Sequence, residues 1–116
     1  MAVAFRPDEV LELAFAVRGD EDDHGNARIS LSGEFDLAGI PLFAQELERL
    51  QAHGRDVELV DLAELVFIDA VGLHAVMDVR EKAGDGRPPP ALVGASAPVS
   101  RVFELVGLEH HLTDRR

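Results

Sequence analysis

The stretch from residue 56 to residue 82, DVELVDLAELVFIDAVGLHAVMDVREK, constrains the fold more than any other part of the chain. Its first part, residues 57–62, is mostly apolar apart from Glu58 and Asp61, and we interpret it as a central strand covered on both faces. After Asp69 the apolar residues instead follow the spacing of a helix. They are Leu73, Val76, Met77 and Val79. The stretch therefore predicts a buried strand that leads directly into a helix, which is a basic unit of α/β folds.

Asp69 stands where the N-cap of that helix is expected. A carboxylate there can accept a hydrogen bond from a free amide of the first turn, and its charge suits the positive end of the helix dipole. Gly72 costs helix stability relative to alanine, but it lets another backbone approach the helix closely. Gly84 and Gly86 are expected to end the helix. The sequence thus predicts a well-defined helix start immediately after the strand.

The rest of the chain predicts strands and helices in alternation after an opening hairpin. The expected strands are residues 10–17, 27–32, 57–62 and 91–93, with residues 108–112 as a further edge segment. An acidic loop at 19–26 and a turn at 33–36 are expected to separate the first elements. One helix begins near Pro41 and ends at Gly54, and another covers residues 99–106 and ends at Gly107. The inward residues of this last helix are expected to be Val99, Val102, Phe103 and Val106.

This order of elements predicts an α/β fold with a small mixed β-sheet flanked by α-helices. A chain of 116 residues is long enough for one ordinary domain with a modest core. We expect a single domain over residues 1–116, with its core from about residue 10 to residue 112.

Charge and residue usage exclude several classes of function. The chain has no cysteine, which excludes disulfides, thiol catalysis and cysteine-ligated metals. Its net charge of −11, from 22 acidic and 11 basic residues, repels phosphate backbones, so we expect no nucleic-acid partner. No apolar run reaches the length of a membrane span, and the first residues lack the pattern of a secretory signal. We therefore expect no membrane insertion and a cytoplasmic location.

Two acidic or histidine-rich segments invite a comparison with metal sites. The acidic run that starts at Asp20 fails the EF-hand template, because the twelfth position, which needs a glutamate, is Leu31. Glu109, His110 and His111 are adjacent and lack the spacing of a zinc site. We interpret the first segment as a solvated loop and the second as surface, and we expect no metal and no cofactor.

Catalytic motifs are equally scarce. Asp69 and His74 are five residues apart across a helix start, with no nucleophile near them. The glycine-rich phosphate-binding motifs GxxxxGKS/T and GxGxxG are absent from the sequence. We expect no catalytic residue, so a protein that binds a partner is a better hypothesis than an enzyme.

Three blocks of the sequence, in this order, resemble the STAS domain of bacterial anti-sigma factor antagonists. SLSGEFDLAGIPLF resembles the pattern LxGELDLxxxPxL, through Leu31, Gly33, Glu34, Asp36, Leu37, Pro41 and Leu42. VDLAELVFIDAVGLHAVMDV resembles DLSxVxFIDSxGLxxL, through Asp61, Leu62, Leu65, Phe67, Ile68, Asp69, Gly72 and Leu73. APVSRVFELVGLEHHL resembles SPxVxRVLELxGLDxxF, through Pro98, Val99, Arg101, Val102, Glu104, Leu105, Gly107, Leu108 and Leu112. The resemblance implies a mixed sheet whose first strands are antiparallel, and an anti-sigma factor with serine-kinase activity as the partner.

Residue 70 departs from the family pattern. The resemblance implies that such antagonists are phosphorylated on the hydroxyl that follows the aspartate of the FIDS segment. This chain has Ala70 at that position and Val71 after it, and it has no Ser, Thr or Tyr between Ser32 and Ser96. A phosphate would add about −1.5 to −2 charges at pH 7. We therefore expect the usual phosphorylation switch to be missing at this position.

Two hypotheses on function follow. In the first, the protein binds an anti-sigma factor and so influences sigma-factor-dependent transcription, without phosphorylation at the usual site. The expected partner-binding residues are Glu34, Asp36, Asp69, Ala70, Val71, Gly72 and His74. The alternative is a small-molecule-sensing or accessory STAS domain of a transport or signalling system. Whether the chain forms a homodimer stays open.

Overall fold

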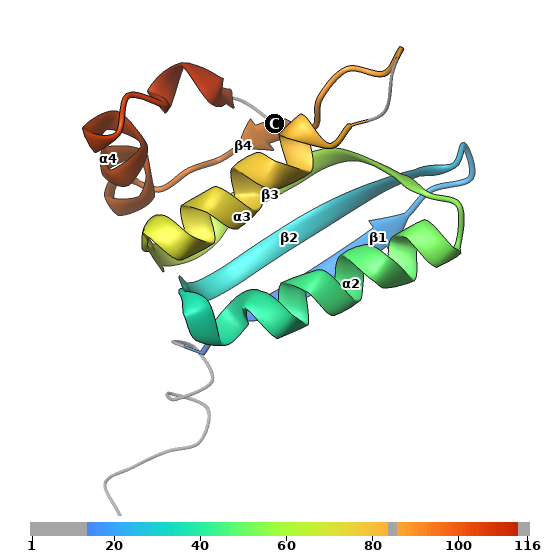
Figure 1. Cartoon of the computed structure of the whole chain (residues 1–116), viewed down its shortest axis with the longest axis horizontal. Helices are drawn as coiled ribbons and strands as arrows, with labels where there is room; N and C mark the ends of the chain where they lie inside the picture. The colour runs from blue at the N-terminus through green and yellow to red at the C-terminus, as the bar shows by residue number, and fades with distance from the viewer. Residues whose placement is uncertain (1–13, 84–85, 114–116) are drawn as a thin grey trace, which may run out of the picture.

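A five-stranded sheet runs through the residues that the computed structural model describes, 14–83 and 86–113 (Figure 1). The strands are β1 (Ala16–Glu21), β2 (Asn26–Phe35), β3 (Asp56–Ile68), β4 (Ala91–Val93) and β5 (Leu112–Thr113). They lie side by side in the order of the sequence. β1 is antiparallel to β2, whereas all the other neighbouring strands are parallel. The predicted small mixed sheet with an antiparallel start is therefore confirmed.

Helices connect the parallel strands. The described residues form α2 (Ile40–Ala52), α3 (Ala70–Glu81) and α4 (Ala97–Leu105), with short 3-10 turns η1 (Leu37–Gly39) and η2 (Glu109–His111). Each α-helix joins one strand to the next along the sheet, and all three connections run in the same direction. Because such crossovers are right-handed, the three helices lie on one face of the sheet. Figure 1 shows α2 and α3 next to each other over β1, β2 and β3.

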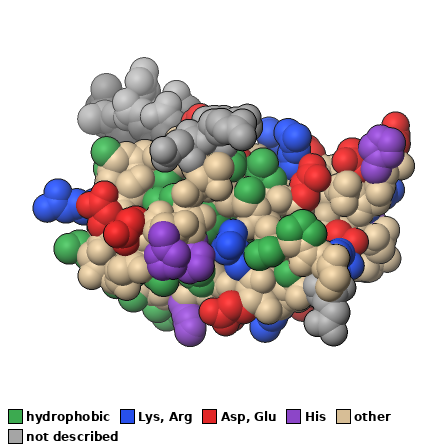
Figure 2. Space-filling view, turned by 90° about the horizontal axis from the view of Figure 1, so that it is seen from above, with side chains coloured by type: hydrophobic (Ala, Val, Ile, Leu, Met, Phe, Trp, Pro, Cys, Tyr) green, Lys and Arg blue, Asp and Glu red, His purple; other side chains and the backbone are tan. Residues whose placement is uncertain are grey.

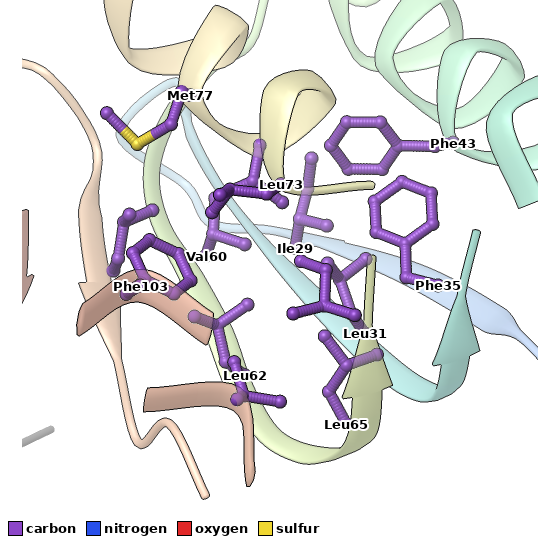
Figure 3. Packing of buried hydrophobic residues seen from close by; sticks show 14 of the residues in the cluster. Ile29, Leu31, Phe35, Phe43, Val60, Leu62, Leu65, Leu73, Met77 and Phe103 are labelled. Atoms are coloured by element: carbon purple, nitrogen blue, oxygen red, sulfur yellow. The ribbon is translucent and has the colours of Figure 1, made fainter. Parts of the chain in front are cut away.

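The core lies between this layer of helices and the sheet (Figure 3). Phe35 from β2 and Phe43 from α2 pack edge to face, with ring centroids 5.1 Å apart. Phe103 from α4 is fully buried in the same cluster as Leu62 from β3 and Met77 from α3 (Figure 3). Burying each of these large apolar side chains stabilises the fold by about 1.5–3 kcal/mol. The core therefore fixes all three helices onto the same sheet face.

β3 is longer and more open than the sequence predicts. It extends from Asp56 to Ile68 rather than over residues 57–62, and it lies in the centre of the sheet. Helices cover only one of its faces, so Glu64 is exposed on this strand. The prediction of a central strand was right, but the prediction of cover on both faces was wrong. The apolar run alone could not show that all crossovers place their helices on the same side.

Several element bounds also differ from the predictions. The first described strand is β1 at Ala16–Glu21, whereas the predicted strand at 10–17 lies partly outside the described residues. The predicted turn at 33–36 belongs mostly to β2, which passes Gly33 with φ +82° where its register with β3 shifts. Such a shift is a β-bulge, which glycine accommodates without strain. Gly84 lies outside the described residues.

The helix ends also differ. α3 ends at Glu81, ahead of the two glycines that were expected to end it. Val106 follows the end of α4 and is 54% exposed instead of facing inward, whereas Val99 and Phe103 are buried as expected. None of the helices in residues 14–83 and 86–113 is both long and apolar enough to cross a bilayer.

Candidate partner-binding site

The ends of β2 and β3 and the starts of α2 and α3 meet at one edge of the sheet (Figure 1). Asp69 is the N-cap of α3, as predicted, and its Oδ1 accepts a hydrogen bond from the Gly72 amide at 2.9 Å. Asp36 caps η1 in the same way, accepting from the Ala38 amide at 3.0 Å. Both carboxylates therefore have a defined orientation at the helix starts, where negative charge is favoured.

Gly72 fixes the start of α3 against the end of β2. A Cβ added at Gly72 would lie 2.5 Å from the carbonyl oxygen of Phe35 and 3.0 Å from the Phe35 ring. The same carbonyl accepts a hydrogen bond from the Asp69 amide at 3.2 Å. Gly72 is buried, so the backbone that approaches it closely is that of Phe35 in the same chain. Gly72 thus allows the start of α3 to pack tightly on the end of β2 below the candidate site.

The other predicted partner-binding residues are brought together at this edge. Glu34 pairs with Phe67 across β2 and β3, one residue before Phe35 pairs with Ile68. Ala70, Val71 and His74 on α3 are exposed, as is Glu34, whereas the capping residues Asp36 and Asp69 are half-buried.

Exposed apolar side chains accompany them, and the sequence singled out only one of these, Val71, as a partner-binding residue. Leu37 is 70% exposed, Phe67 is 45% exposed and Val71 is 42% exposed. Phe67 lies in the apolar run VFID, which resembles a core strand, and only the register of β3 shows that it faces outward. Exposed apolar groups surrounded by polar ones are typical of protein interaction sites.

We call this region the strand-end surface. It consists of Glu34, Asp36, Leu37, Phe67, Asp69, Ala70, Val71 and His74. Within the described part of the chain, no ion pair engages any charged residue of this surface. Its three carboxylates and single histidine therefore favour a partner that supplies basic groups.

Elsewhere the charges are mixed. Figure 2 shows acidic, basic and histidine side chains intermingled with apolar ones on the face that is seen from above. The described residues contain no group of three or more metal-binding side chains in reach of one ion. The rings of His110 and His111 lie with their centroids 4.1 Å apart and are tilted by 40°. Partial burial lowers the pKa of His111, and the nearby His110 and Arg80 lower it further.

The acidic loop serves the hairpin. Asp22 Oδ1 accepts hydrogen bonds from the amides of His24 at 2.8 Å and Asn26 at 2.9 Å. Both hydrogen bonds lower the pKa of Asp22, and the bond from Asn26 has the larger effect. The carboxylate therefore closes the turn at residues 22–25. This turn is shorter than the predicted loop at 19–26, because residues 19–21 belong to β1 and Asn26 belongs to β2.

Comparisons with known proteins identify the family. A family model described as "Mlab, STAS domain" matches residues 19–114. This chain belongs to the STAS domain family. The STAS resemblance of the three sequence blocks is thereby confirmed. No curated protein matches the sequence significantly.

Solved structures agree with this STAS fold. One is an anti-sigma factor antagonist from Mycobacterium paratuberculosis, with a TM-score of 0.73 and 24% identity, covering 95% of this chain and 88% of that one. Another is the anti-sigma factor antagonist SpoIIAA in its unphosphorylated form, with a TM-score of 0.72 and 19% identity. That match covers 87% of this chain and 89% of SpoIIAA. At these identities the similarity establishes the shared fold.

The hydroxyl groups of this STAS domain lie away from residue 70 in the sequence. Ala70 is exposed as the first residue of α3. Ser96 is half-buried, and its hydroxyl donates a hydrogen bond to the carbonyl of Leu65 at 3.0 Å. Ser30 and Ser32 are half-buried within β2. The family position that follows the capping aspartate thus presents a methyl group to the solvent.

Proposed function

We propose that this STAS protein is an anti-sigma factor antagonist-like regulator. It binds an anti-sigma factor of the serine-kinase type through the strand-end surface and so influences sigma-factor-dependent transcription. The observation that carries the proposal is this surface: Leu37, Phe67 and Val71 are each exposed near the edge where β2 and β3 end. The family and the fold of two solved antagonists support the same role.

The composition of the strand-end surface fits a protein partner. Its apolar side chains would be buried first on binding, and its carboxylates would form a polar rim. The capping hydrogen bonds of Asp36 and Asp69 and the tight packing of Gly72 on Phe35 hold the surface in one conformation. A surface that is already ordered loses little conformational entropy when it binds.

Residue 70 distinguishes this protein from a phosphorylated antagonist. A methyl group cannot accept phosphate, and the neighbouring Val71 offers no hydroxyl either. We expect binding to be independent of phosphorylation at this position, so that any regulation acts elsewhere. Ala70 is then a contact residue next to the exposed side chain of Val71.

The direct test combines the purified protein with anti-sigma kinases encoded in the same genome, with and without ATP. We expect a stable complex with one of them and no transfer of phosphate to this chain. Phosphate on the chain would contradict the phosphorylation-independent part of the proposal. If the protein binds none of these kinases, the proposed role itself is contradicted.

Substitutions at residue 70 test the surface. Ala70→Ser restores the family hydroxyl, and we expect a kinase partner to phosphorylate it and release it in the presence of ATP. Ala70→Asp places a charge beside the contact and should weaken binding, whereas Leu105→Asp, at an exposed apolar residue near the end of α4, should not. If Ala70→Asp binds as well as the natural protein, the proposed surface is wrong.

A further inference from the structure

A half-open groove of about 500 Å³ lies between α2 and α3, away from the strand-end surface. Its apolar lining comes from three elements: Ile40, Phe43 and Leu47 of α2, Val57 of β3, and Ala75 and Val79 of α3. All of these except Phe43 are only partly buried, although they pack against the core. The fold therefore leaves a continuous apolar strip in contact with solvent.

Contacts between α2 and β1 explain why the groove is open. Arg49 Nη1 lies 2.8 Å from Glu21 Oε2, and Glu46 accepts a hydrogen bond from the Gly19 amide at 2.9 Å. A Cβ at Gly19 would collide with the Glu46 carboxylate, so glycine permits this approach. These contacts hold α2 over the β1 edge (Figure 1), and its other flank, with Leu47, faces α3 across the groove.

Charges of both signs surround the end of the groove where α2 and α3 end. The basic residues there are Arg55, Lys82 and Arg87, and the acidic ones are Asp56, Glu58 and Asp78. Arg87 pairs with Asp56 at 2.7 Å. Asp78 of α3 and Lys82, the C-cap one turn later, take part in no ion pair within residues 14–83 and 86–113. The rim therefore offers one cation and one anion without a partner.

The surroundings of the groove disfavour an extended peptide as its occupant. The groove meets the sheet only at Asn26 of β2 and residues 56–58 of β3, which is too short a stretch for another strand to add to. The wall at residues 88–90 consists of three prolines, which have no amide hydrogen to donate. Side chains must therefore dominate any binding in this groove.

We propose that the groove binds an amphipathic α-helix of another protein, with an apolar stripe flanked by both acidic and basic residues. A helix is about 10–12 Å across, so only its apolar side chains enter the half-open groove while its backbone stays outside. The lining of α2 from Ile40 to Gln51 spans roughly 16 Å, which matches about three turns of a helix. Lys82 and Asp78 would pair with residues of opposite sign beside the stripe, whereas an amphiphile with a single charge would leave one of them unmatched.

The test titrates the full chain with a synthetic peptide of about 16 residues, long enough to populate a helix. Its leucines stand at i, i+4, i+7 and i+11 with glutamate and lysine on both flanks, and a control peptide has the same composition without the stripe. We expect the striped peptide to bind at least about tenfold more tightly than the control by calorimetry. Its binding should shift the NMR signals of Leu47, Ala75 and Val79.

Variants of the protein locate the binding. Ala75→Leu fills the groove without removing any contact, and Val79→Asp places a charge in it. Each substitution should weaken the binding of the striped peptide at least about tenfold. Lys82→Glu should weaken it less, because that charge lies at the rim. Leu105→Asp makes the same kind of change as Val79→Asp, but on α4 outside the groove, and should leave binding unchanged. Circular dichroism checks that each variant is folded.

The proposal is overturned if the striped peptide does not bind, if the control peptide binds as well, or if binding survives Ala75→Leu. It is also overturned if dodecanoate occupies the groove and the striped peptide does not, since the site would then belong to a small amphiphile. These results say nothing against the strand-end surface, because the probe contains no anti-sigma factor and the groove variants leave residues 34–37 and 67–71 intact.

Discussion

The charged residues around Glu21 and those of the strand-end surface lie at opposite ends of the helix-covered sheet, and they differ in how they are paired. At the end where β1 and α2 finish, the carboxylate of Glu21 lies 2.8 Å from Arg49, 2.9 Å from His53 and 2.9 Å from Arg55. We call these four residues the Glu21 cluster. At the strand-end surface, the charged residues form no ion pair in the described part of the chain, and apolar side chains are exposed among them.

The Glu21 cluster therefore serves stability, whereas the strand-end surface is available for binding. The Glu21 cluster satisfies its own charges and connects β1 to α2, so a partner would gain little from them. Hydrogen bonds lower the pKa of Glu21 to about 2; the bond from His53 contributes most and the bond from Arg49 contributes next. The strand-end surface instead keeps its side chains available for a partner, and its internal hydrogen bonds cap the helix starts and orient the carboxylates.

Two phenylalanines give the largest expected contrast. Phe35 is fully buried beneath the strand-end surface and stacks on Phe15 at 4.3 Å between ring centroids. We expect Phe35→Ala to lower the free energy of unfolding by about 3–5 kcal/mol in urea titrations. Phe67→Ala should cost about 1 kcal/mol or less, since Phe67 is already 45% exposed. Equal losses would mean that Phe67 serves stability rather than binding.

Partner binding should show the next largest effect. Val71→Asp puts a charge among the exposed apolar groups of the strand-end surface. We expect it to weaken the anti-sigma complex by about 2 kcal/mol, or roughly thirtyfold in Kd by calorimetry, with little change in the urea midpoint. Glu21→Gln is the control from the other end and should leave the Kd unchanged. If Glu21→Gln weakens the complex and Val71→Asp does not, the partner binds at the Glu21 cluster and not at the strand-end surface.

Two substitutions of Asp69, the N-cap of α3, distinguish its role in stability from the role of its negative charge in binding. Asp69→Ala removes the acceptor of the Gly72 amide, and we expect a loss of about 0.5–2 kcal/mol in thermal or urea unfolding. Asp69→Asn keeps a capping oxygen and should restore most of that loss. If the asparagine variant is stable but binds the partner weakly, the negative charge of Asp69 belongs to the interface.

The pH dependence of the Glu21 cluster gives the smallest effect. Because the pKa of Glu21 is lowered from 4.5 to about 2 by folding, the unfolded state binds the proton more readily. Its contribution to stability is complete above about pH 4.5 and disappears as the pH falls towards 2. We expect the urea midpoint of the natural protein to fall more steeply below pH 4.5 than that of Glu21→Gln. Parallel curves would show that solvent screens the cluster completely.

Local patterns predicted the elements of the fold well. The helical spacing after Asp69 and the capping carboxylate set the start of α3, and the glycines at 54 and 107, both with positive φ, follow the ends of α2 and α4. Bounds that depend on neighbouring strands were less predictable. β2 continues through the expected turn at 33–36, because β3 pairs with it as far as Phe35.

The candidate site was predicted in part. The sequence pointed to Glu34, Asp36 and residues 69–74, and the structure brings these to one edge of the sheet. It did not point to Leu37 and Phe67, because an apolar residue in an apolar run is usually a core residue. Gly72 was expected to contact a partner, yet it is buried against Phe35.

The sequence by itself determined the local chemistry: the absence of a hydroxyl at residue 70, the acidic balance and the caps that start the helices. These follow from residue type and short-range spacing, which need no knowledge of the rest of the chain. Only the tertiary structure decided which apolar side chains remain exposed and that α2 and α3 enclose an open groove. Both depend on strand register and on how closely a helix approaches its sheet, and contacts between residues far apart in the sequence fix these distances.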